Sequence, residues 1–153
     1  MKKLSIILFV ALLSATTFAQ TAAKRTKEFN LENKIAIQGY DPVAYFTQKK
    51  AVKGKSSLAS TFEGVTYNFS SQANKDTFLK SPTSYEPQYG GWCAYAMGAN
   101  GEKVEVDPDT FKIVNGKLFL FYNAYFNNTL KSWSKDEANL NKKADANWKK
   151  FIN

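Results

Sequence analysis

The chain contains no histidine, one cysteine and two methionines among its 153 residues. The absence of histidine excludes a Ser-His-Asp triad, a Cys-His pair and every His-based metal motif. The single cysteine, Cys93, has no partner for a disulfide within the chain, so a packed core must stabilise the fold. Aromatic residues are plentiful enough to build that core, with 12 Phe, 8 Tyr and 3 Trp.

The N-terminal residues have the order of features of a secretory signal. Lys2 and Lys3 precede an apolar run from Leu4 to Leu13, and small residues precede a cleavage point after Ala19. The run is too short to span a bilayer as a stable helix, although a retained anchor is the alternative. We therefore expect residues 1–19 to be a signal peptide. The protein would then be exported, periplasmic or secreted, with no stable membrane insertion after the signal is removed.

The remaining residues, about 134 of them, suit one domain. Loss of Lys2 and Lys3 lowers the formal charge from +8 to about +6. The lysines are scattered and lie mostly towards the C-terminus, which is typical of a solvated surface. We expect no nucleic-acid partner, and nothing in the sequence indicates an oligomeric state.

Two hairpins are predicted. Glu63-Gly64 separates alternating runs within STFEGVTYNF, in which Val65, Tyr67 and Phe69 share a face. Asn115-Gly116 within TFKIVNGKLFLFY is the favoured two-residue turn. The run LFLFY that follows is apolar on both faces, which predicts a strand at the centre of its sheet.

Capping signals predict three helices. Asp41-Pro42 begins a short turn or helix, serines begin a helix that stops at Ser81-Pro82, and Ser134 with Glu137 forms a capping-box pattern. Behind that pattern an amphipathic helix is predicted, its apolar stripe packed onto the sheet. Its stripe consists of Leu140, Ala144, Trp148 and Phe151. A helix lying on a membrane surface is the alternative.

The predicted fold is therefore a small single α+β domain. Two β-hairpins form an antiparallel sheet, with short helices and the C-terminal amphipathic helix. Residues 20–32 are polar and aperiodic and read as a flexible N-terminal arm, and residues 33–153 form the domain.

Three motifs, GYDPVAYF at 39–46, YGGWCAYAMGANG at 89–101 and VDPDTFKIVNGKLFLFYN at 106–123, resemble the YHS-domain family. The likeness extends over about residues 35–125 and is greatest to the exported bacterial form, a selenoprotein-like form in which Cys93 stands where relatives have selenocysteine. The resemblance implies a single exported module with metal binding. The sequence departs from the family pattern by lacking histidine and by having Phe111 and Phe119 where tryptophan and tyrosine are usual.

Three interpretations of Cys93 remain open. A free cysteine is among the most buried residue types and fills core space. Alternatively, the Gly90-Gly91 pair opens backbone N–H groups towards a reactive thiol. In the third interpretation Cys93 is a metal ligand together with Met97, four residues later, because thiolate and thioether suit Cu(I). Met97 as a core gap-filler is the alternative.

Tyrosines, a tryptophan and an aspartate within the first two motifs are the expected lining of a pocket with Cys93 at its floor. This set consists of Tyr40, Asp41, Tyr45, Tyr89, Trp92 and Tyr95. A core role for the tyrosines, with hydroxyls at the rim, is the alternative. Asp41 and Asp107 each precede a proline, which fits paired acid–base groups or ordinary capped turns.

The functional hypothesis is an exported module that binds a small molecule or a soft metal such as copper, or performs thiol redox chemistry, through Cys93. Two alternatives come from other classes. One is a thiol-dependent enzyme with Cys93 as nucleophile or peroxidatic thiol, and the other is a structural interaction domain.

Overall fold

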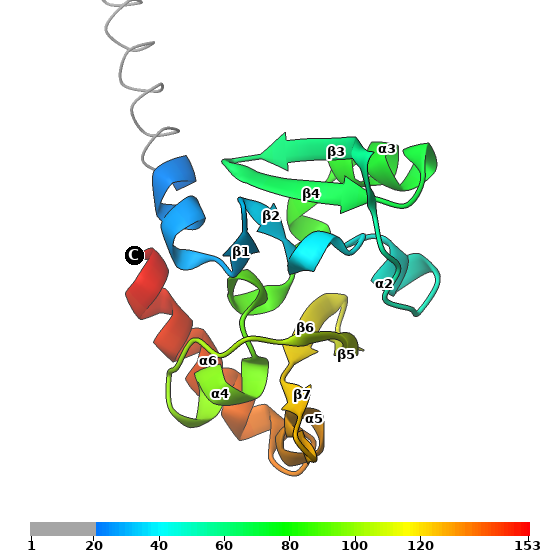
Figure 1. The fold of residues 1–153 in the computed structure, drawn as a ribbon. Coiled ribbons are helices and arrows are strands. Elements are labelled where there is room, and N and C mark those ends of the chain that lie inside the picture. Colours follow the sequence, from blue (N-terminus) through cyan, green and yellow to red (C-terminus); the bar gives the residue numbers. More distant parts are fainter. Residues whose placement is uncertain (1–20) are drawn as a thin grey trace, which may run out of the picture.

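The structure, a computed structural model, describes residues 21–153. The predicted signal peptide at residues 1–19 lies outside the described residues. Figure 1 shows two connected halves, one around strands β3 and β4 and the other around β5, β6 and the C-terminal helix. The α+β class predicted from the sequence is confirmed.

The first half is built on a four-stranded sheet in the order β1-β2-β4-β3. β3 (Lys55–Phe62) and β4 (Val65–Phe69) form the hairpin predicted around Glu63-Gly64. β2 (Ile35–Ala36) pairs in parallel with β4, and β1 (Leu31–Glu32) is antiparallel to β2. The predicted inward face of β4 is confirmed, because Val65, Tyr67 and Phe69 are fully buried.

The helices of this half begin where the sequence indicates. Ser71 caps α3 (Gln72–Lys80) by accepting a hydrogen bond from the Asn74 N–H at 3.1 Å, and the helix stops before Ser81-Pro82. Phe78 of α3 packs its ring 4.8 Å from that of Tyr67. The helix α2 (Ala44–Thr47) follows Asp41-Pro42. Short 3₁₀ turns occupy Ile37–Gly39, Pro82–Ser84 and Gln88–Gly91.

The second predicted hairpin is also present, but it does not join the first sheet. β5 (Asp107–Val114) and β6 (Lys117–Phe121) pair across Asn115-Gly116 as a separate two-stranded sheet. A third pair, β7 (Asn123–Ala124) and β8 (Asn127–Asn128), follows directly. The prediction of one antiparallel sheet is therefore corrected to three separate sheets among residues 21–153.

β6 is buried on both faces, as its apolar run indicates, yet it is not central in a larger sheet. Leu118 and Leu120 belong to the core cluster shared with β4 and α3, whereas Phe119 and Phe121 belong to a second cluster beneath the C-terminal helices. Its free edge meets the connecting segment through a parallel bridge between Pro87 and Leu118. β6 thus separates the two hydrophobic clusters and contributes side chains to both.

The C-terminal segment forms two helices, α5 (Thr129–Trp133) and α6 (Glu137–Ile152). The capping box is not formed, because no side chain caps α6 and Glu137 instead forms an ion pair with Lys112 on β5. The predicted stripe is correct, since Leu140 and Ala144 are buried and Trp148 and Phe151 pack beside them. The stripe lies mainly against α4 (Ala94–Ala99) rather than the sheet.

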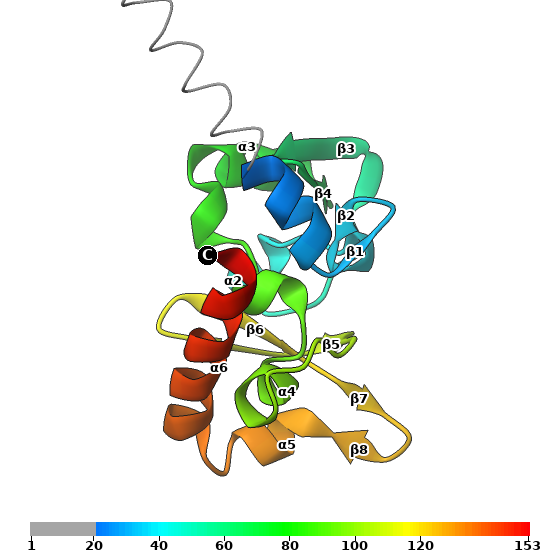
Figure 2. The ribbon, with the colours of Figure 1, turned by 90° about the vertical axis from the view of Figure 1, so that its left-hand side faces the viewer.

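The N-terminal residues differ from the flexible arm expected at 20–32. Residues 21–28 are helical, and this helix packs beside α6 and the first sheet (Figures 1 and 2). Arg25 anchors it by an ion pair with Glu86, and its guanidinium lies 4.5 Å from the ring centroid of Phe29 and 5.3 Å from that of Phe62. The helix was not predicted from its polar sequence, because polar residues such as Arg25 and Glu28 make its contacts with the rest of the fold.

Within residues 21–153, no helix has the length and apolar character needed to cross a bilayer.

The contact between α4 and α6 generates the first testable prediction. A Cβ atom on Gly98 would lie 2.5 Å from the Leu140 carbonyl oxygen and 3.2 Å from the Leu140 Cα. Glycine-to-alanine changes in helices ordinarily stabilise by about 1 kcal/mol. Here we expect Gly98→Ala to lower the free energy of unfolding by about 1–3 kcal/mol, because the two helices must separate. Urea unfolding followed by tryptophan fluorescence measures the change.

The control is Ala146→Gly at an exposed position of α6. It should lower the free energy of unfolding by about 1 kcal/mol, the ordinary difference in helix propensity between alanine and glycine. A Gly98→Ala variant that is more stable than the parent would show that the helices do not touch as described.

Candidate functional site

The turn at Tyr89-Gly90-Gly91 sets the geometry of the region between the two halves. All three residues have left-handed backbone angles, with φ of 56°, 60° and 87°. Glycine is required at position 90, because a Cβ there would lie 2.8 Å from the Phe29 ring and 2.9 Å from that of Trp148. Tyr89 adopts this conformation at a steric cost that its burial and hydrogen bonds offset.

The Tyr89 side chain connects the turn to α6. Its hydroxyl donates to Asn141 Oδ1 at 2.8 Å or to Asp145 Oδ1 at 3.0 Å. Burial, and then the charge of Asp145, raise the pKa of Tyr89 well above its ordinary value, so the phenol keeps its proton. The Tyr89 hydrogen bonds therefore hold the turn in place against the C-terminal helix α6.

Cys93 follows this turn and points into the core instead of an open recess. Its side chain is 0% exposed. The Cys93 sulfur lies 3.4 Å from the Tyr122 backbone N–H, which donates to it, and 3.4 Å from Thr129 Oγ1. Because the Thr129 hydroxyl donates its own hydrogen to the Tyr122 carbonyl at 2.9 Å, the thiol is the donor to Thr129. The expectation of a reachable sulfur is corrected, and the packing interpretation fits these contacts.

Met97 is equally buried but packs in the other core. Cys93 belongs to the cluster of β4 and α3, and Met97 to the cluster of α6, although the Met97 N–H donates to the Cys93 carbonyl at 3.0 Å. Among residues 21–153, no group of three or more His, Cys, Asp or Glu side chains is placed to hold a metal ion.

The residues expected to line a pocket around the thiol make specific contacts of their own. Tyr45 is fully buried and donates to the Pro108 carbonyl at 2.9 Å, and burial raises its pKa above the ordinary value. Trp92 donates its indole N–H to the Glu28 carbonyl at 2.7 Å. The Lys53 ammonium nitrogen lies 4.5 Å from the centroid of the Tyr40 ring. Tyr95 is half-buried and packs against both hydrophobic clusters.

Asp41 is a fully buried carboxylate that accepts five hydrogen bonds. Oδ1 accepts from the backbone N–H groups of Val43 and Ala44 at 2.9 and 3.3 Å. Oδ2 accepts from the Ser70 N–H at 2.8 Å, the Ser70 hydroxyl at 2.6 Å and the Asn74 amide at 2.7 Å. These bonds tie the start of α2 to the end of β4 and to α3, which is a structural role.

Asp107 is likewise occupied by its own turn. It accepts from the Asp109 N–H at 3.1 Å and the Thr110 hydroxyl at 2.7 Å. The two Asp-Pro carboxylates therefore serve separate turns, as the capping interpretation predicts.

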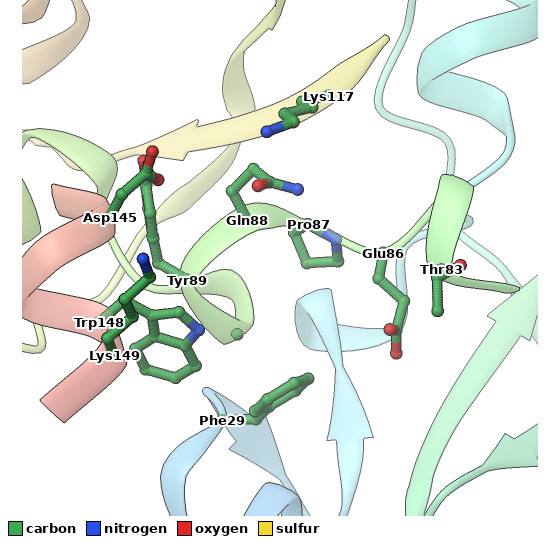
Figure 3. Close-up of a pocket in the computed structure, with 11 residues that line it drawn as sticks. Phe29, Thr83, Glu86, Pro87, Gln88, Tyr89, Lys117, Asp145, Trp148 and Lys149 are labelled. Carbon is green, nitrogen blue, oxygen red and sulfur yellow. The ribbon is translucent and has the colours of Figure 1, made fainter. Parts of the chain in front are cut away.

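A pocket lies above the Tyr89 turn and is called the aromatic pocket (Figure 3). Its volume is about 310 Å³. It is bounded by the end of the N-terminal helix, the segment before Tyr89, the start of β6 and one face of α6. The lining consists of Phe29, Thr83, Glu86, Pro87, Gln88, Tyr89, Gly90, Lys117, Asp145, Trp148 and Lys149.

The charges of the aromatic pocket are unequally satisfied. Glu86 is held by Arg25 and accepts the Tyr67 hydroxyl at 2.5 Å. Burial, followed by the Glu86 charge, raises the pKa of Tyr67. Lys117 and Lys149, in contrast, form no ion pair or side-chain hydrogen bond with any of residues 21–153. Two free ammonium groups thus border an aromatic wall of Phe29 and Trp148.

Of the predicted site residues, only Tyr89 lines the aromatic pocket. Sequence reasoning placed Trp148 on a core stripe and assigned Phe29 to a flexible arm. The amphipathic stripe could have indicated this pocket. It ends with two large aromatic residues, Trp148 and Phe151, where α6 extends beyond α4.

One comparison with known protein families finds a match in part of the chain. The YHS domain family matches residues 43–89, which run from the residue before α2 through β3, β4 and α3 to Tyr89. The resemblance to the YHS domain family predicted over 35–125 is therefore confirmed for residues 43–89. The match ends before Cys93. No curated protein and no solved structure matches the chain.

The Asp41 hydrogen bonds generate the second testable prediction. In Asp41→Asn the amide NH₂ faces donors whichever way it is turned, and the charge that strengthens the bonds is lost. We expect the free energy of unfolding to fall by about 3 kcal/mol, measured in urea.

The exposed Asp109→Asn substitution is the control and should change stability by less than about 0.5 kcal/mol. Equal stability losses in both variants would mean that Asp41 has no special structural role.

Proposed function

We propose that this protein is an exported YHS-domain binding module whose ligand site is the aromatic pocket. The observation that carries the proposal is the pairing of an aromatic wall, the mutually tilted rings of Phe29 and Trp148, with two ammonium groups that are unpaired among residues 21–153. The ligand class that suits this lining is a small anion with an aromatic or other flat apolar body. The role is binding, and no reaction step is attributed to the pocket.

The aromatic wall is positioned by packing on both sides. The Phe29 and Trp148 ring centroids are 5.9 Å apart, and Phe151 supports Trp148 from behind at 5.8 Å. Gly90 leaves these rings room to close over the turn. A flat ligand body can therefore stack on preformed apolar surface, at a low cost in side-chain ordering.

The polar groups orient the same ligand. Lys117 points into the pocket from β6, opposite the end occupied by Trp148 and Lys149 (Figure 3). An anionic group between the aromatic wall and these lysines gains charge-assisted hydrogen bonds. Asp145 has one oxygen close to Tyr89, and its other oxygen is an acceptor for a donor group on the ligand.

The third testable prediction follows from the lysines. With 2-naphthoate as the probe, we expect saturable quenching of tryptophan fluorescence with a Kd between about 10 µM and 1 mM. The double variant Lys117→Gln/Lys149→Gln should weaken binding roughly tenfold, a loss of about 1.4 kcal/mol. The matched control is Lys142→Gln, an exposed lysine of α6 outside the pocket, which should leave Kd unchanged.

Binding to the uncharged 2-naphthamide should be weaker than binding to the carboxylate in the parent protein. Equal affinities of the parent and the double variant for 2-naphthoate would contradict the proposal, as would the absence of saturation below about 5 mM.

A second candidate function is soft-metal handling at Cys93 and Met97. Its support is the association of YHS domains with copper handling and the presence of both sulfur residues at adjacent turns of α4. Thiolate and thioether donors suit Cu(I). Since Tyr122 and Thr129 cover the Cys93 sulfur, binding requires local opening of the segment that contains β7, β8 and α5. A thiol-redox role would need the same opening.

The fourth testable prediction measures this opening. We expect a thiol reagent to modify Cys93 at least roughly 100-fold more slowly in the native protein than in urea, because reaction waits for local unfolding. If copper is the ligand, Cu(I) supplied from a buffered complex stays bound at about one per chain through gel filtration. Cys93→Ser should abolish this retention and Met97→Leu should reduce it.

Fast native labelling would show that the sulfur is not covered. Retention of Cu(I) by Cys93→Ser would place the metal elsewhere, and no retention by the parent would reject the copper candidate.

A further inference from the structure

The tip of the hairpin between β7 and β8 presents two aromatic side chains to solvent. Tyr125 is 91% exposed and Phe126 is fully exposed at 111%. Figure 2 shows this hairpin reaching out from the end of the molecule that contains α5, on a different side from α6. Isolated exposed apolar residues are ordinary, but two adjacent aromatics on a projecting tip form an unpartnered apolar surface.

The backbone of this tip makes the aromatic residues still less expected. Tyr125 and Phe126 have φ of 50° and 62°, the left-handed angles of a two-residue turn that favours Asn-Gly. The chain uses that pair at Asn115-Gly116. Tyr89 is also left-handed, but it is buried and hydrogen-bonded, whereas Tyr125 and Phe126 are exposed and gain no such packing from the described part of the chain, residues 21–153. Stability of the fold therefore does not account for these two residues.

The hairpin base holds the tip in place. The Asn123 amide donates to the Thr110 hydroxyl at 2.9 Å, and the Thr129 N–H donates to the Tyr122 carbonyl at 3.0 Å. Asn128 caps α5 by accepting from the Leu130 N–H at 3.1 Å. The aromatic pair is thus presented on an ordered support, which lowers the entropic cost of docking.

The charge pattern around the tip indicates what it docks on. No charged residue occurs between Lys117 and Lys131, so the tip can leave water without burying a charge. Exposed lysines follow directly, at positions 131 and 135. Three carboxylates belong to the neighbouring segments. Asp107 on β5 is engaged by Thr110 and Asn123, Asp109 on β5 is exposed, and Asp136 follows Lys135 in the sequence.

We infer that the hairpin tip is a peripheral docking point for an anionic lipid bilayer. Tyr125 and Phe126 enter the interfacial layer, where aromatic side chains are favoured, and Lys131 and Lys135 approach the headgroup phosphates. The contact is shallow and reversible, because two side chains bury little apolar area. This inference does not depend on the ligand of the aromatic pocket.

The fifth testable prediction uses a substitution that separates binding from folding. Tyr125→Asn/Phe126→Gly replaces the aromatic pair by the favoured turn sequence, so its resistance to urea should equal or exceed that of the parent. Protein from the exported fraction of expressing cells is mixed with sucrose-loaded vesicles of phosphatidylglycerol and phosphatidylcholine and sedimented. We expect the double variant to lose at least roughly tenfold in partition coefficient.

Three comparisons complete the design. Leu79→Gln removes a half-exposed apolar side chain on α3 and should leave partitioning unchanged. Lys131→Gln/Lys135→Gln should reduce binding to the anionic vesicles, and the parent should bind pure phosphatidylcholine more weakly. All variants share the same N-terminus, confirmed by mass spectrometry, so differences arise from the folded part.

Failure of the parent to sediment with anionic vesicles overturns the inference. Unchanged partitioning of Tyr125→Asn/Phe126→Gly, or an equal loss in Leu79→Gln, overturns it as well. Cross-linking of the tip to a protein in the absence of vesicle binding would assign the surface to a protein partner instead.

Discussion

The burial of β6 on both faces is the constraint on which the rest of the structure depends. Leu118 and Leu120 point into the core of the first sheet, and Phe119 and Phe121 point into the core under α6. Because alternate residues of a strand face opposite sides, one short strand can complete two hydrophobic clusters. Neither half of the molecule has a closed core without it, so the YHS segment at 43–89 depends on residues beyond its own end.

The position of the aromatic pocket follows from this arrangement. The segment that joins the two halves must run along the free edge of β6, where Pro87 bridges to Leu118. It then turns sharply at Tyr89-Gly90-Gly91 to enter α4. At this turn the end of the N-terminal helix and α6 approach from either side, and the Phe29 and Trp148 rings pack over Gly90. The pocket is the space that remains, and its aromatic wall comes from the two helix ends.

Local signals in the sequence predicted the elements better than their assembly. Glu63-Gly64, Asn115-Gly116 and Ser71 determine turns and a cap through their own backbone chemistry, and all three act as expected. The run LFLFY correctly indicated that β6 is buried on both faces. It did not indicate its place in the sheet, because a strand buried against helices has the same apolar pattern as a strand in the middle of a larger sheet. Helix 21–28 was missed because its contacts include the ion pairs Arg25–Glu86 and Glu28–Lys103 with distant parts of the chain, which no periodicity records.

The candidate site in the structure, the aromatic pocket, does not include Cys93. Rarity drew attention to the single thiol, yet rarity is a property of composition, and reactivity requires exposure and a nearby charge. The Cys93 sulfur is covered, and its two hydrogen-bond partners, the Tyr122 N–H and the Thr129 hydroxyl, are neutral. Unused interaction capacity lies instead in common residues: Lys117 and Lys149, which have no partner within residues 21–153, Trp148 at the pocket wall, and Tyr125 with Phe126 at a strained tip. A folded chain satisfies most of its polar and apolar groups internally, so the groups that it leaves unsatisfied at ordered positions are the better indicators of what it binds.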